Sequence, residues 1–498
     1  AAKAKNNGGL DEVIRKYALQ NATEFEGRAN SGAVIGKVLA EKPELKGRVK
    51  EISAAVNQTV AEVNKLPFEQ QLIELQEYSA QLPEKKKDVK KELPELPGAV
   101  KGKVVTRIPP EPSKHLHIGH ALSFLINSLY ADKYAGKCFL RFEDTNPELS
   151  KQEYVDSILE DLEYLGIKPD KTVFISNDLP KLYKYAEKLV RANKAYVCFC
   201  EQNKMRELRH KGVECSCRES SVTLNSENWK QMLAKKFKEG EAVLRLTGDM
   251  KAHNQAMRDP VLFRINFTGH YLQGAKYCVW PTYDFANAVE DGLMKITHIM
   301  RSSEFGTMRI ELHDVIKQLL SLPQQEVIQY GRFNVAGAVA QGRELRELIK
   351  QGAYTGWNDP RLVTIKALKR RGILPETFRH LAVEVGLTPS ETNLDWKLIA
   401  AFNRKLVDSK ANRYFYVEGQ REIVVMGSPE RAVELKLHPD HPERGTRAFT
   451  VKDRFLVAAK DLEEVSKLKD NSLVRLMDCL NFRKTKHGFA FDSFEVEK

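Results

Sequence analysis

Hydrophobic positions along the first hundred residues predict helices followed by a break. Apolar residues recur at three- and four-residue spacings from about Leu10 to Phe25, which favours an amphipathic helix. A second helical stretch is predicted from about Val49 to Gln81. Residues 84–98 are then dominated by charged side chains and end in two prolines. We therefore predict a helical N-terminal domain over residues 1–83 and a linker over residues 84–100.

Beyond the linker, short apolar runs alternate with amphipathic helices. Lys103 to Ile108 and Cys138 to Phe142 are predicted to be buried strands, each followed by a helix. The second helix would open at Ser150, with Glu153 three residues later in a capping-box pattern, and would end at Gly166. This alternation predicts a parallel sheet with right-handed crossovers, and therefore an α/β fold. Ligands bind such sheets at the carboxyl ends of the strands, so chemistry is expected in the loop after the first strand.

The last part of the chain changes character again. The pattern from about Arg343 to Phe415 is mostly helical. Beyond Arg413 it shifts to short alternating segments such as YFYVEG, REIVVMG and RFLVAA, separated by turns. This predicts a β-rich C-terminal domain.

Length and charge narrow the class of protein. A chain of 498 residues is expected to form three or more domains. No apolar run is long enough to cross a membrane and the N-terminus lacks the apolar core of a signal peptide, so we expect a cytoplasmic protein. The formal net charge of +12 favours a polyanionic partner such as nucleic acid, although a solvated basic surface would also account for it.

The strongest local signal for chemistry is His117-Ile118-Gly119-His120, between a predicted strand and a predicted helix. A glycine lets the backbone approach a ligand closely, and a helix N-terminus attracts phosphate. The two imidazoles could donate to a phosphate as negative charge develops on it. The alternative is a pair of exposed histidines on a loop.

Four of the seven cysteines fall in one short segment, as two Cys-x-Cys pairs. Such pairs suit a closed tetrahedral Zn²⁺ site, with buried or free thiols as the alternative and His210 as a possible replacement for one ligand. The remaining cysteines, Cys138, Cys278 and Cys479, are isolated and are predicted to lie in the core. The predicted zinc ligands are Cys198, Cys200, Cys215 and Cys217.

Several motifs in order resemble one known family. TRIPPEPSKHLHIGHA (106–121), RFEDTNP (141–147) and WPTYDFANAVEDGLMKITHIMRSSEF (280–305) resemble the three signatures of class I glutamyl- and glutaminyl-tRNA synthetases. YTGWNDPRLVTIKALKRRGI (354–373) is similar to a later helical region of these enzymes. KYALQNA and GAVIGKVLAEKPEL resemble the N-terminal extension of the archaeal glutamyl-tRNA synthetases. The resemblance covers nearly the whole chain.

This resemblance implies a multidomain α/β architecture around a Rossmann-type catalytic domain. The implied parts are the two catalytic halves (101–195 and 276–342), an acceptor-binding insertion (196–275), a helical stem-contact domain (343–412) and a β-barrel anticodon-binding domain (413–498). The family usually continues for several more strands, so the barrel would be shortened.

The resemblance also implies the reaction. The α-carboxylate of L-glutamate would attack the α-phosphorus of ATP with Mg²⁺ on the phosphates, and tRNA(Glu) would then accept glutamate from the glutamyl-adenylate. The family further implies that tRNA is present before activation and that the enzyme is a monomer. Charging of tRNA(Gln) as well is left open.

The family's functional residues carry over to matching positions. Arg107 would meet the glutamate side-chain carboxylate, for which a bidentate guanidinium is suited, and Glu143 would hold the α-ammonium. Asp144 could cap the turn at Asn146-Pro147. Tyr283 resembles a pocket residue, with a core aromatic as the alternative. The implied substrate-binding residues are Arg107, Glu143, Tyr283, Asn287 and Arg301, the ATP-binding ones are Pro110, His117, Gly119, His120, Glu304 and Arg343, and the catalytic ones are His117, His120 and Arg343.

One segment departs from the family pattern. Where the family has a second ATP loop of Lys-Met-Ser-Lys-Ser type, this chain has Ala340-Gln341-Gly342-Arg343, without lysine or serine. Arg343 could supply the positive charge and Gly342 the freedom of a loop. Weakened activation, or a synthetase-like protein without activity, is left open.

Three other functions remain as alternatives. A glutaminyl-tRNA synthetase shares the three signatures, but the archaeal-type extension favours glutamate. A nucleotidyltransferase that binds no tRNA would share the histidine loop, but the long C-terminal half and the basic charge are against it. A catalytically inactive tRNA-binding module would explain the altered second loop.

Overall fold

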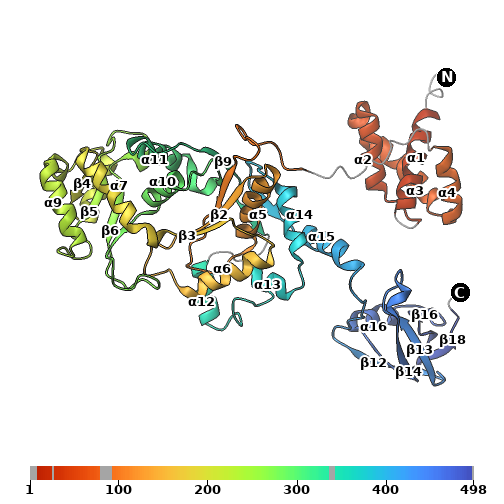
Figure 1. Cartoon of the computed structure of the whole chain (residues 1–498). Helices are drawn as coiled ribbons and strands as arrows, with labels where there is room; N and C mark the ends of the chain where they lie inside the picture. The colour runs from red at the N-terminus through yellow and green to blue at the C-terminus, as the bar shows by residue number, and fades with distance from the viewer. Residues whose placement is uncertain (1–7, 25–26, 79–91, 336–341, 496–498) are drawn as a thin grey trace. The chain divides into compact units, whose positions relative to one another are not determined.

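The computed structural model describes residues 8–24, 27–78, 92–335 and 342–495. It divides into two compact units, Ala1–Lys90 and Lys91–Lys498 (Figure 1). Residues 84–91 of the predicted linker lie outside the described residues, and 92–100 belong to the second unit. No described helix has the length and apolar character needed to span a membrane.

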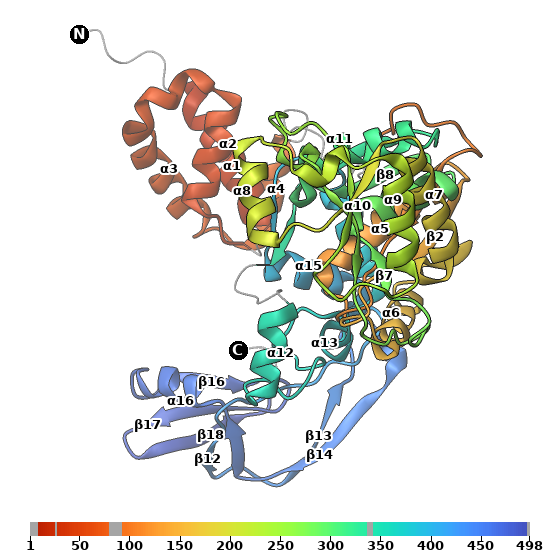
Figure 2. The ribbon, with the colours of Figure 1, turned by 90° about the vertical axis from the view of Figure 1, so that its left-hand side faces the viewer.

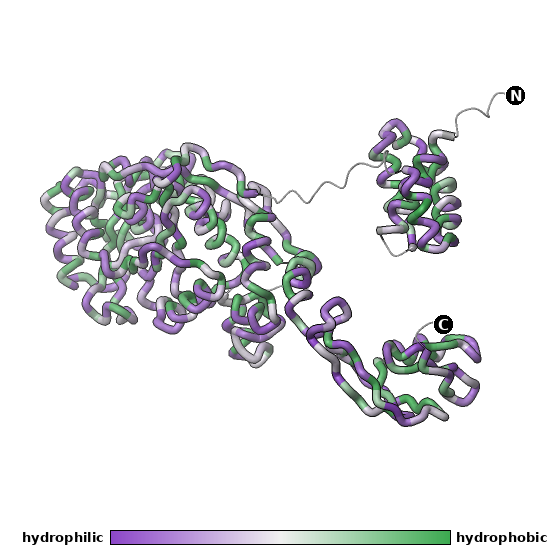
Figure 3. Tube along the Cα trace, turned by 45° about the vertical axis from the view of Figure 1, so that its right-hand side comes forward, coloured by the Kyte–Doolittle hydropathy of each residue, from purple (hydrophilic) through white to green (hydrophobic). Residues whose placement is uncertain are grey.

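The first unit is a helical bundle around a small apolar core. The predicted first helix is confirmed, but the stretch predicted as one helix from Val49 to Gln81 forms two. Pro67 lies at the break, because it has no backbone N–H to continue a helix and is accommodated at the helix start. Hydrophobic and hydrophilic positions alternate along the helices (Figure 3). The elements are α1 (Gly8–Glu24), α2 (Ser31–Glu41), η1 (Pro43–Arg48), α3 (Val49–Val63) and α4 (Phe68–Glu77).

The second unit begins with the parallel sheet that the sequence predicts. Strands β1 (Val105–Ile108), β2 (Lys137–Phe142) and β3 (Lys171–Phe174) pair in parallel. A second parallel pair, β8 (His298–Ser302) and β9 (Glu326–Tyr330), lies beside β1. The backbone N–H of Thr297 donates to Val105 O over 2.9 Å at this junction. The carboxyl ends of all five strands therefore meet at one edge of the fold.

Two helices connect these strands, α5 (Ile118–Lys133) and α6 (Gln152–Tyr164). Gly166 ends α6 as predicted, with a positive φ of 70°. The predicted cap is wrong, because the N-cap is Lys151 and no side chain caps the helix. Ser150 belongs instead to the preceding turn, where its N–H donates to Asn146 O over 3.0 Å.

The chain between the two parallel pairs, together with the segment between β8 and β9, forms a mixed α/β region with its own apolar core. An antiparallel sheet is covered by helices that include α7, α9, α10 and α11 (Figure 1). The strands are β4 (Ala195–Cys198), β5 (Val243–Leu246), β6 (Val261–Ile265) and β7 (Val279–Pro281), in that order. The helices and short turns are η2 (Ile175–Asp178), α7 (Leu179–Arg191), α8 (Gln202–Lys211), η3 (Ser216–Glu219), α9 (Val222–Leu233), η4 (Gln255–Met257), α10 (Tyr283–Leu293), η5 (Ser303–Phe305) and α11 (Gly306–Leu319).

A mostly helical segment follows, as predicted. Strand β10 (Phe333–Val335) pairs in parallel with β11 (Thr392–Leu394), and the N–H of Ile118 donates to Val363 O over 3.0 Å. These bonds attach the helical segment to the start of α5. Its helices are α12 (Gly342–Lys350), α13 (Ile365–Arg370), α14 (Pro375–Val385) and α15 (Trp396–Asp408).

The C-terminal region is β-rich, which confirms the prediction (Figure 2). Tyr414 to Gly419, predicted to form a strand, forms none, and Tyr416 is 88% exposed. Among the described residues, no strand pairs with this segment. A five-stranded sheet has the order β15-β12-β18-β17-β16, and β13 pairs with β14. The elements are β12 (Arg421–Met426), β13 (Arg431–Lys436), η6 (Pro442–Arg444), β14 (Thr446–Val451), β15 (Arg454–Val457), α16 (Ala459–Ser466), β16 (Leu473–Leu476), β17 (Leu480–Thr485) and β18 (Gly488–Ser493).

Candidate active site

A cavity of about 950 Å³ lies at the carboxyl ends of the parallel strands, where the sequence predicts chemistry. Residues from β1, α5, α10, β8 and the loop after β2 reach it from separate parts of the chain. The side chain of Arg343 lies outside the described residues, so its role stays a prediction. The predicted binding residues that line the cavity are Arg107, Pro110, His117, Gly119, His120, Glu143, Tyr283, Asn287, Arg301 and Glu304.

The two histidines of the first loop also cap helix α5. His117 is the N-cap, and its Nδ1 accepts from the backbone N–H of Gly119 over 3.1 Å. His120 Nδ1 accepts from the backbone N–H of His117 over 3.2 Å. Because each Nδ1 accepts, the proton of each neutral ring is assigned to Nε2. Both rings therefore offer an N–H donor and are held 3.7 Å apart between centroids.

Gly119 is required by the packing of this turn. A Cβ at that position would lie 2.9 Å from His117 Cε1 and 3.3 Å from the carbonyl oxygen of Phe333. Neither contact could relax without moving the imidazole or the β10 backbone. The glycine therefore fixes how closely the histidine loop and β10 approach.

Burial keeps both imidazoles neutral. Burial, together with the charges of Lys114 and Arg332, lowers the pKa of His117 to about 3. Burial also lowers the pKa of His120, with His117 and Lys114 contributing. The pair can therefore act as neutral hydrogen-bond donors to a phosphate that gains charge.

A buried ion network fixes the opposite side of the cavity. Arg141 is fully buried and donates to Asp291 Oδ1 over 2.7 Å, Asn287 Oδ1 over 2.6 Å and Glu143 Oε1 over 3.2 Å. Arg107 donates from Nε to the same Asp291 oxygen over 3.3 Å. One carboxylate thus compensates two buried guanidinium groups, as buried charges require.

Within the network, the pKa of Asp291 is lowered and the pKa of Glu143 is raised. Desolvation raises the pKa of Asp291, but Arg141 and Arg107 lower it more, and the net shift is downward. Desolvation dominates for Glu143, whose pKa is raised although Arg141 and Arg107 act against it. A carboxyl group that is buried without full compensation is suited to receive a cationic ligand.

Arg141 and Asp291 were missed by the sequence reasoning, although both stand inside the quoted motifs. Their spacing of 150 residues gives no local sign of a contact. The available signal was an arginine in the middle of an apolar strand, since a buried guanidinium needs a buried carboxylate.

Asp144 points away from the cavity and anchors the loop that carries Glu143. The prediction that it caps the following turn is wrong, because Asn146 Oδ1 accepts from the N–H of Glu148 over 3.3 Å there. Asp144 instead accepts from Ser176 N–H over 2.9 Å, Ser176 Oγ over 2.7 Å and Tyr271 Oη over 3.2 Å. The loop is therefore held at fixed depth beside the cavity.

His270 completes this anchor. Its Nδ1 accepts from the backbone N–H groups of Leu272 and Gln273, each over 3.2 Å, which places its proton on Nε2. Its Nε2 lies 2.8 Å from the carbonyl oxygen of Asp144 and donates to it. The turn between β6 and β7 is thereby joined to the loop after β2.

Tyr283 lies at the cavity wall. Burial raises its pKa, and the guanidinium of Arg309 lies 5.2 Å from its ring centroid. Asp284 accepts two hydrogen bonds from Arg309, over 2.6 and 2.7 Å, and its Oδ1 lies 3.0 Å from His313 Nε2.

Arg301 lies on the same wall. Burial lowers its pKa, and Tyr283 partly offsets this lowering through its charge and a hydrogen bond. The wall presents ordered cations to an anionic ligand.

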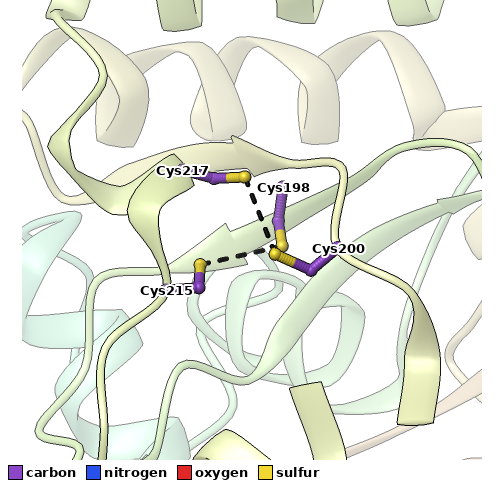
Figure 4. Close-up of side chains that lie close together, drawn as sticks. All are labelled: Cys198, Cys200, Cys215 and Cys217. Carbon is purple, nitrogen blue, oxygen red and sulfur yellow. Dashed lines mark hydrogen bonds between the residues drawn. The ribbon is translucent and has the colours of Figure 1, made fainter. Parts of the chain in front are cut away.

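The four clustered cysteines converge as predicted (Figure 4). The Sγ atoms of Cys198 and Cys215 are 3.9 Å apart, those of Cys200 and Cys217 are 3.8 Å apart, and all four lie within 4.8 Å of one another. A tetrahedron with Zn–S bonds of about 2.3 Å has S···S edges of about 3.8 Å. The donor set and its dimensions therefore fit Zn²⁺, and His210 is not part of the described cluster.

The other cysteines lie where core residues are expected. Cys138 and Cys278 are buried, and Cys479 packs against the apolar core of the C-terminal region. Burial raises the pKa of each of these thiols.

The chain is similar to protein families and to individual proteins of known function. Residues 103–409 match the family described as tRNA synthetases class I (E and Q), catalytic domain. Residues 411–493 match the one described as tRNA synthetases class I (E and Q), anti-codon binding domain. The glutamate–tRNA ligase of Pyrococcus abyssi is 44% identical over 500 residues, covering 98% of this chain and 87% of that protein. That of Nitrosopumilus maritimus is 40% identical over 481 residues, covering 96% and 84%.

The chain belongs to the class I tRNA synthetases for glutamate and glutamine. Within this family its similarity is to the archaeal glutamate–tRNA ligases, as the resemblance of its motifs predicts.

Proposed function

We propose that this protein is an ATP-dependent glutamate–tRNA ligase. The observation that carries the proposal is one cavity that joins a pair of neutral imidazole donors to a wall of buried arginines. The first feature suits a phosphate and the second suits a dicarboxylate amino acid. The family membership and the glutamate-specific relatives support the same function and do not favour glutamine or an inactive module.

Each wall residue then has a role toward glutamate. Arg107 binds the side-chain carboxylate, with its Nε held by Asp291 and its terminal nitrogens left to form a bidentate contact. Glu143 receives the α-ammonium, and Arg301 receives the α-carboxylate. Tyr283 and Asn287 line the pocket between them.

Activation needs no covalent participation by the protein. An oxygen of the glutamate α-carboxylate attacks the α-phosphorus, the bond from that phosphorus to the bridging oxygen breaks, and pyrophosphate leaves with the electron pair. His117 and His120 donate from Nε2 to the α-phosphate oxygens, while Pro110, Gly119 and Glu304 shape the nucleotide site. Mg²⁺, when bound, would offset the negative charge of the phosphates. The ribose hydroxyl at the end of tRNA then displaces AMP from the adenylate.

The remaining parts would bind tRNA. We assign residues 196–275 to the acceptor end, 343–412 to the stem and 413–498 to the anticodon. We further propose that the protein acts as a cytoplasmic monomer and that tRNA(Gln) is a second acceptor to be tested beside tRNA(Glu).

The cysteine cluster would hold a structural Zn²⁺ rather than take part in the reaction. Thiolate ligands at this spacing close the coordination shell and leave no position for substrate. Metal analysis of the purified chain should give one zinc per protein, and Cys215→Ser should lower it while Cys278→Ser leaves it unchanged. A metal content that is equal in both variants would remove the zinc assignment.

Aminoacylation of tRNA(Glu) and tRNA(Gln) transcripts with labelled glutamate or glutamine, ATP and Mg²⁺ tests the function. We expect glutamate to be charged onto tRNA(Glu). Charging with glutamine alone would reverse the amino-acid assignment, and tRNA binding without any charging would mark a binding module.

A further inference from the structure

Lys114 stands three residues before His117 in the first loop and lines the same cavity. Its side chain is half-buried, and among the described residues no carboxylate forms an ion pair with it. A lysine can bury its aliphatic stem while its ammonium group stays accessible to a ligand. Its charge is therefore left for a ligand in the cavity.

The charge of Lys114 acts on the phosphate-facing histidines. After burial, it contributes to the lowered pKa of both His117 and His120. Arg332 is the other cation that acts on His117, but it lies 3.5 Å from Glu304 and is partly compensated. Of the two cations, Lys114 is thus the one without an ion-pair partner among the described residues.

The position of Lys114 also depends on Gly342 at the start of α12. A Cβ on residue 342 would lie 2.9 Å from Lys114 Cδ, so the glycine makes room for the lysine stem. This contact brings the first loop against Gly342, the first residue of α12.

We propose that Lys114 binds the β- and γ-phosphates of ATP in the cavity that it lines with His117 and His120. This inference rests on the proposed function. As the bond between the α-phosphorus and the bridging oxygen breaks, the electron pair moves to the β-phosphate, and an ammonium group beside it stabilises the pyrophosphate that leaves. Lys114 would thus contact the leaving group while the histidines contact the α-phosphate.

The charge requirement separates this role from a structural one. Lys114→Gln should weaken ATP binding about 10- to 100-fold, the range expected for loss of a charged hydrogen bond. It should leave the affinity for AMP, which lacks the β- and γ-phosphates, within about twofold, whereas Lys114→Arg should restore most ATP binding. Lys151→Gln is the matched control, because it removes an exposed lysine that does not line the cavity.

Calorimetry on the full chain with tRNA(Glu) and no glutamate, using ATP and AMP in turn, measures these affinities. Equal losses for ATP and AMP, or ATP binding unchanged by Lys114→Gln, would overturn this inference alone. A wild-type chain that binds neither nucleotide would overturn the proposed function together with it. Pyrophosphate exchange should show the same ranking of variants through the KM for ATP.

Discussion

The two ends of the cavity handle charge in different ways. At the amino-acid end, Arg107 and Arg141 share Asp291, and Arg141 also holds Asn287 and Glu143. At the phosphate end the histidines are neutral and serve as the cap of a helix. At the amino-acid end, the charged groups are therefore already paired and oriented before a ligand binds. At the phosphate end, the histidines are uncharged hydrogen-bond donors.

This difference matches the chemistry of the two ligands. Glutamate is small and must be distinguished from glutamine, which requires a rigid cation whose geometry is fixed by its neighbours. A triphosphate carries several charges that move during the reaction, so preset donors and an uncommitted lysine suit it better. The amino-acid end should consequently tolerate changes in charge less well than the phosphate end.

The largest effect should follow from Asp291→Ala. This variant leaves Arg107 and Arg141 buried without their shared carboxylate, which should reduce the free energy of unfolding by about 3–5 kcal/mol. Glutamate activation should fall below detection, because Arg107 loses the contact that orients it. Denaturant unfolding and pyrophosphate exchange measure the two effects.

Asp291→Asn keeps the shape and removes the charge, so it tests the electrostatic part of that prediction. The pKa of Asp291 is lowered in the fold, so its contribution is present above the ordinary aspartate value of about 3.9 and is lost as the pH falls through the folded value. The stability gap between wild type and Asp291→Asn should be constant from about pH 5 to 8 and should narrow below about pH 4. A gap that stays constant at low pH would mean that packing, and not charge, makes Asp291 necessary.

An intermediate effect is expected at the phosphate end from His117→Asn. Asparagine can still accept from the N–H of Gly119 and cap α5, but it has no Nε2–H to offer a phosphate. Activation should slow about 100- to 1,000-fold, the typical loss of one preset donor, while the free energy of unfolding changes by less than about 0.5 kcal/mol.

His117→Ala provides the matched comparison, since it removes both the donor and the cap. It should show the same loss of rate with a further destabilisation of about 1 kcal/mol. If His117→Asn were as active as wild type, the histidine would serve the helix alone and the contrast between the two ends would not hold.

The sequence predicts the parallel sheet and the cavity because both depend on local periodicity and on motifs whose order identifies the family. It fails where a contact joins distant segments, as for Arg141 and Asp291. The cap predicted at Ser150 fails for a related reason, because Asn146 forms a turn that takes up Ser150 before the helix begins. The strand predicted at Tyr414 to Gly419 does not form. An alternating pattern of apolar and polar residues shows that a segment could be a strand, but it does not show whether a neighbouring strand is there to pair with it.

The smallest effect should come from Tyr271→Phe. This variant tests whether the hydrogen bonds to Asp144 fix the position of the loop that carries Glu143. The change removes one of three hydrogen bonds to the Asp144 carboxylate and keeps the two from Ser176. Stability should fall by about 1–2 kcal/mol, since bonds to charged groups contribute about that much. Because Glu143 follows the backbone of Asp144, the KM for glutamate should rise about threefold with kcat unchanged, the pattern of weakened uniform binding.

Tyr277→Phe is the control for this last variant, because no described residue accepts a hydrogen bond from the Tyr277 hydroxyl. It should leave both stability and KM close to wild type. The KM for ATP should stay unchanged in both variants, since the phosphate end does not depend on the Asp144 anchor. A rise in the KM for ATP that equalled the rise for glutamate would show that the anchor supports the whole cavity, and the two ends would then have to be regarded as one mechanical unit.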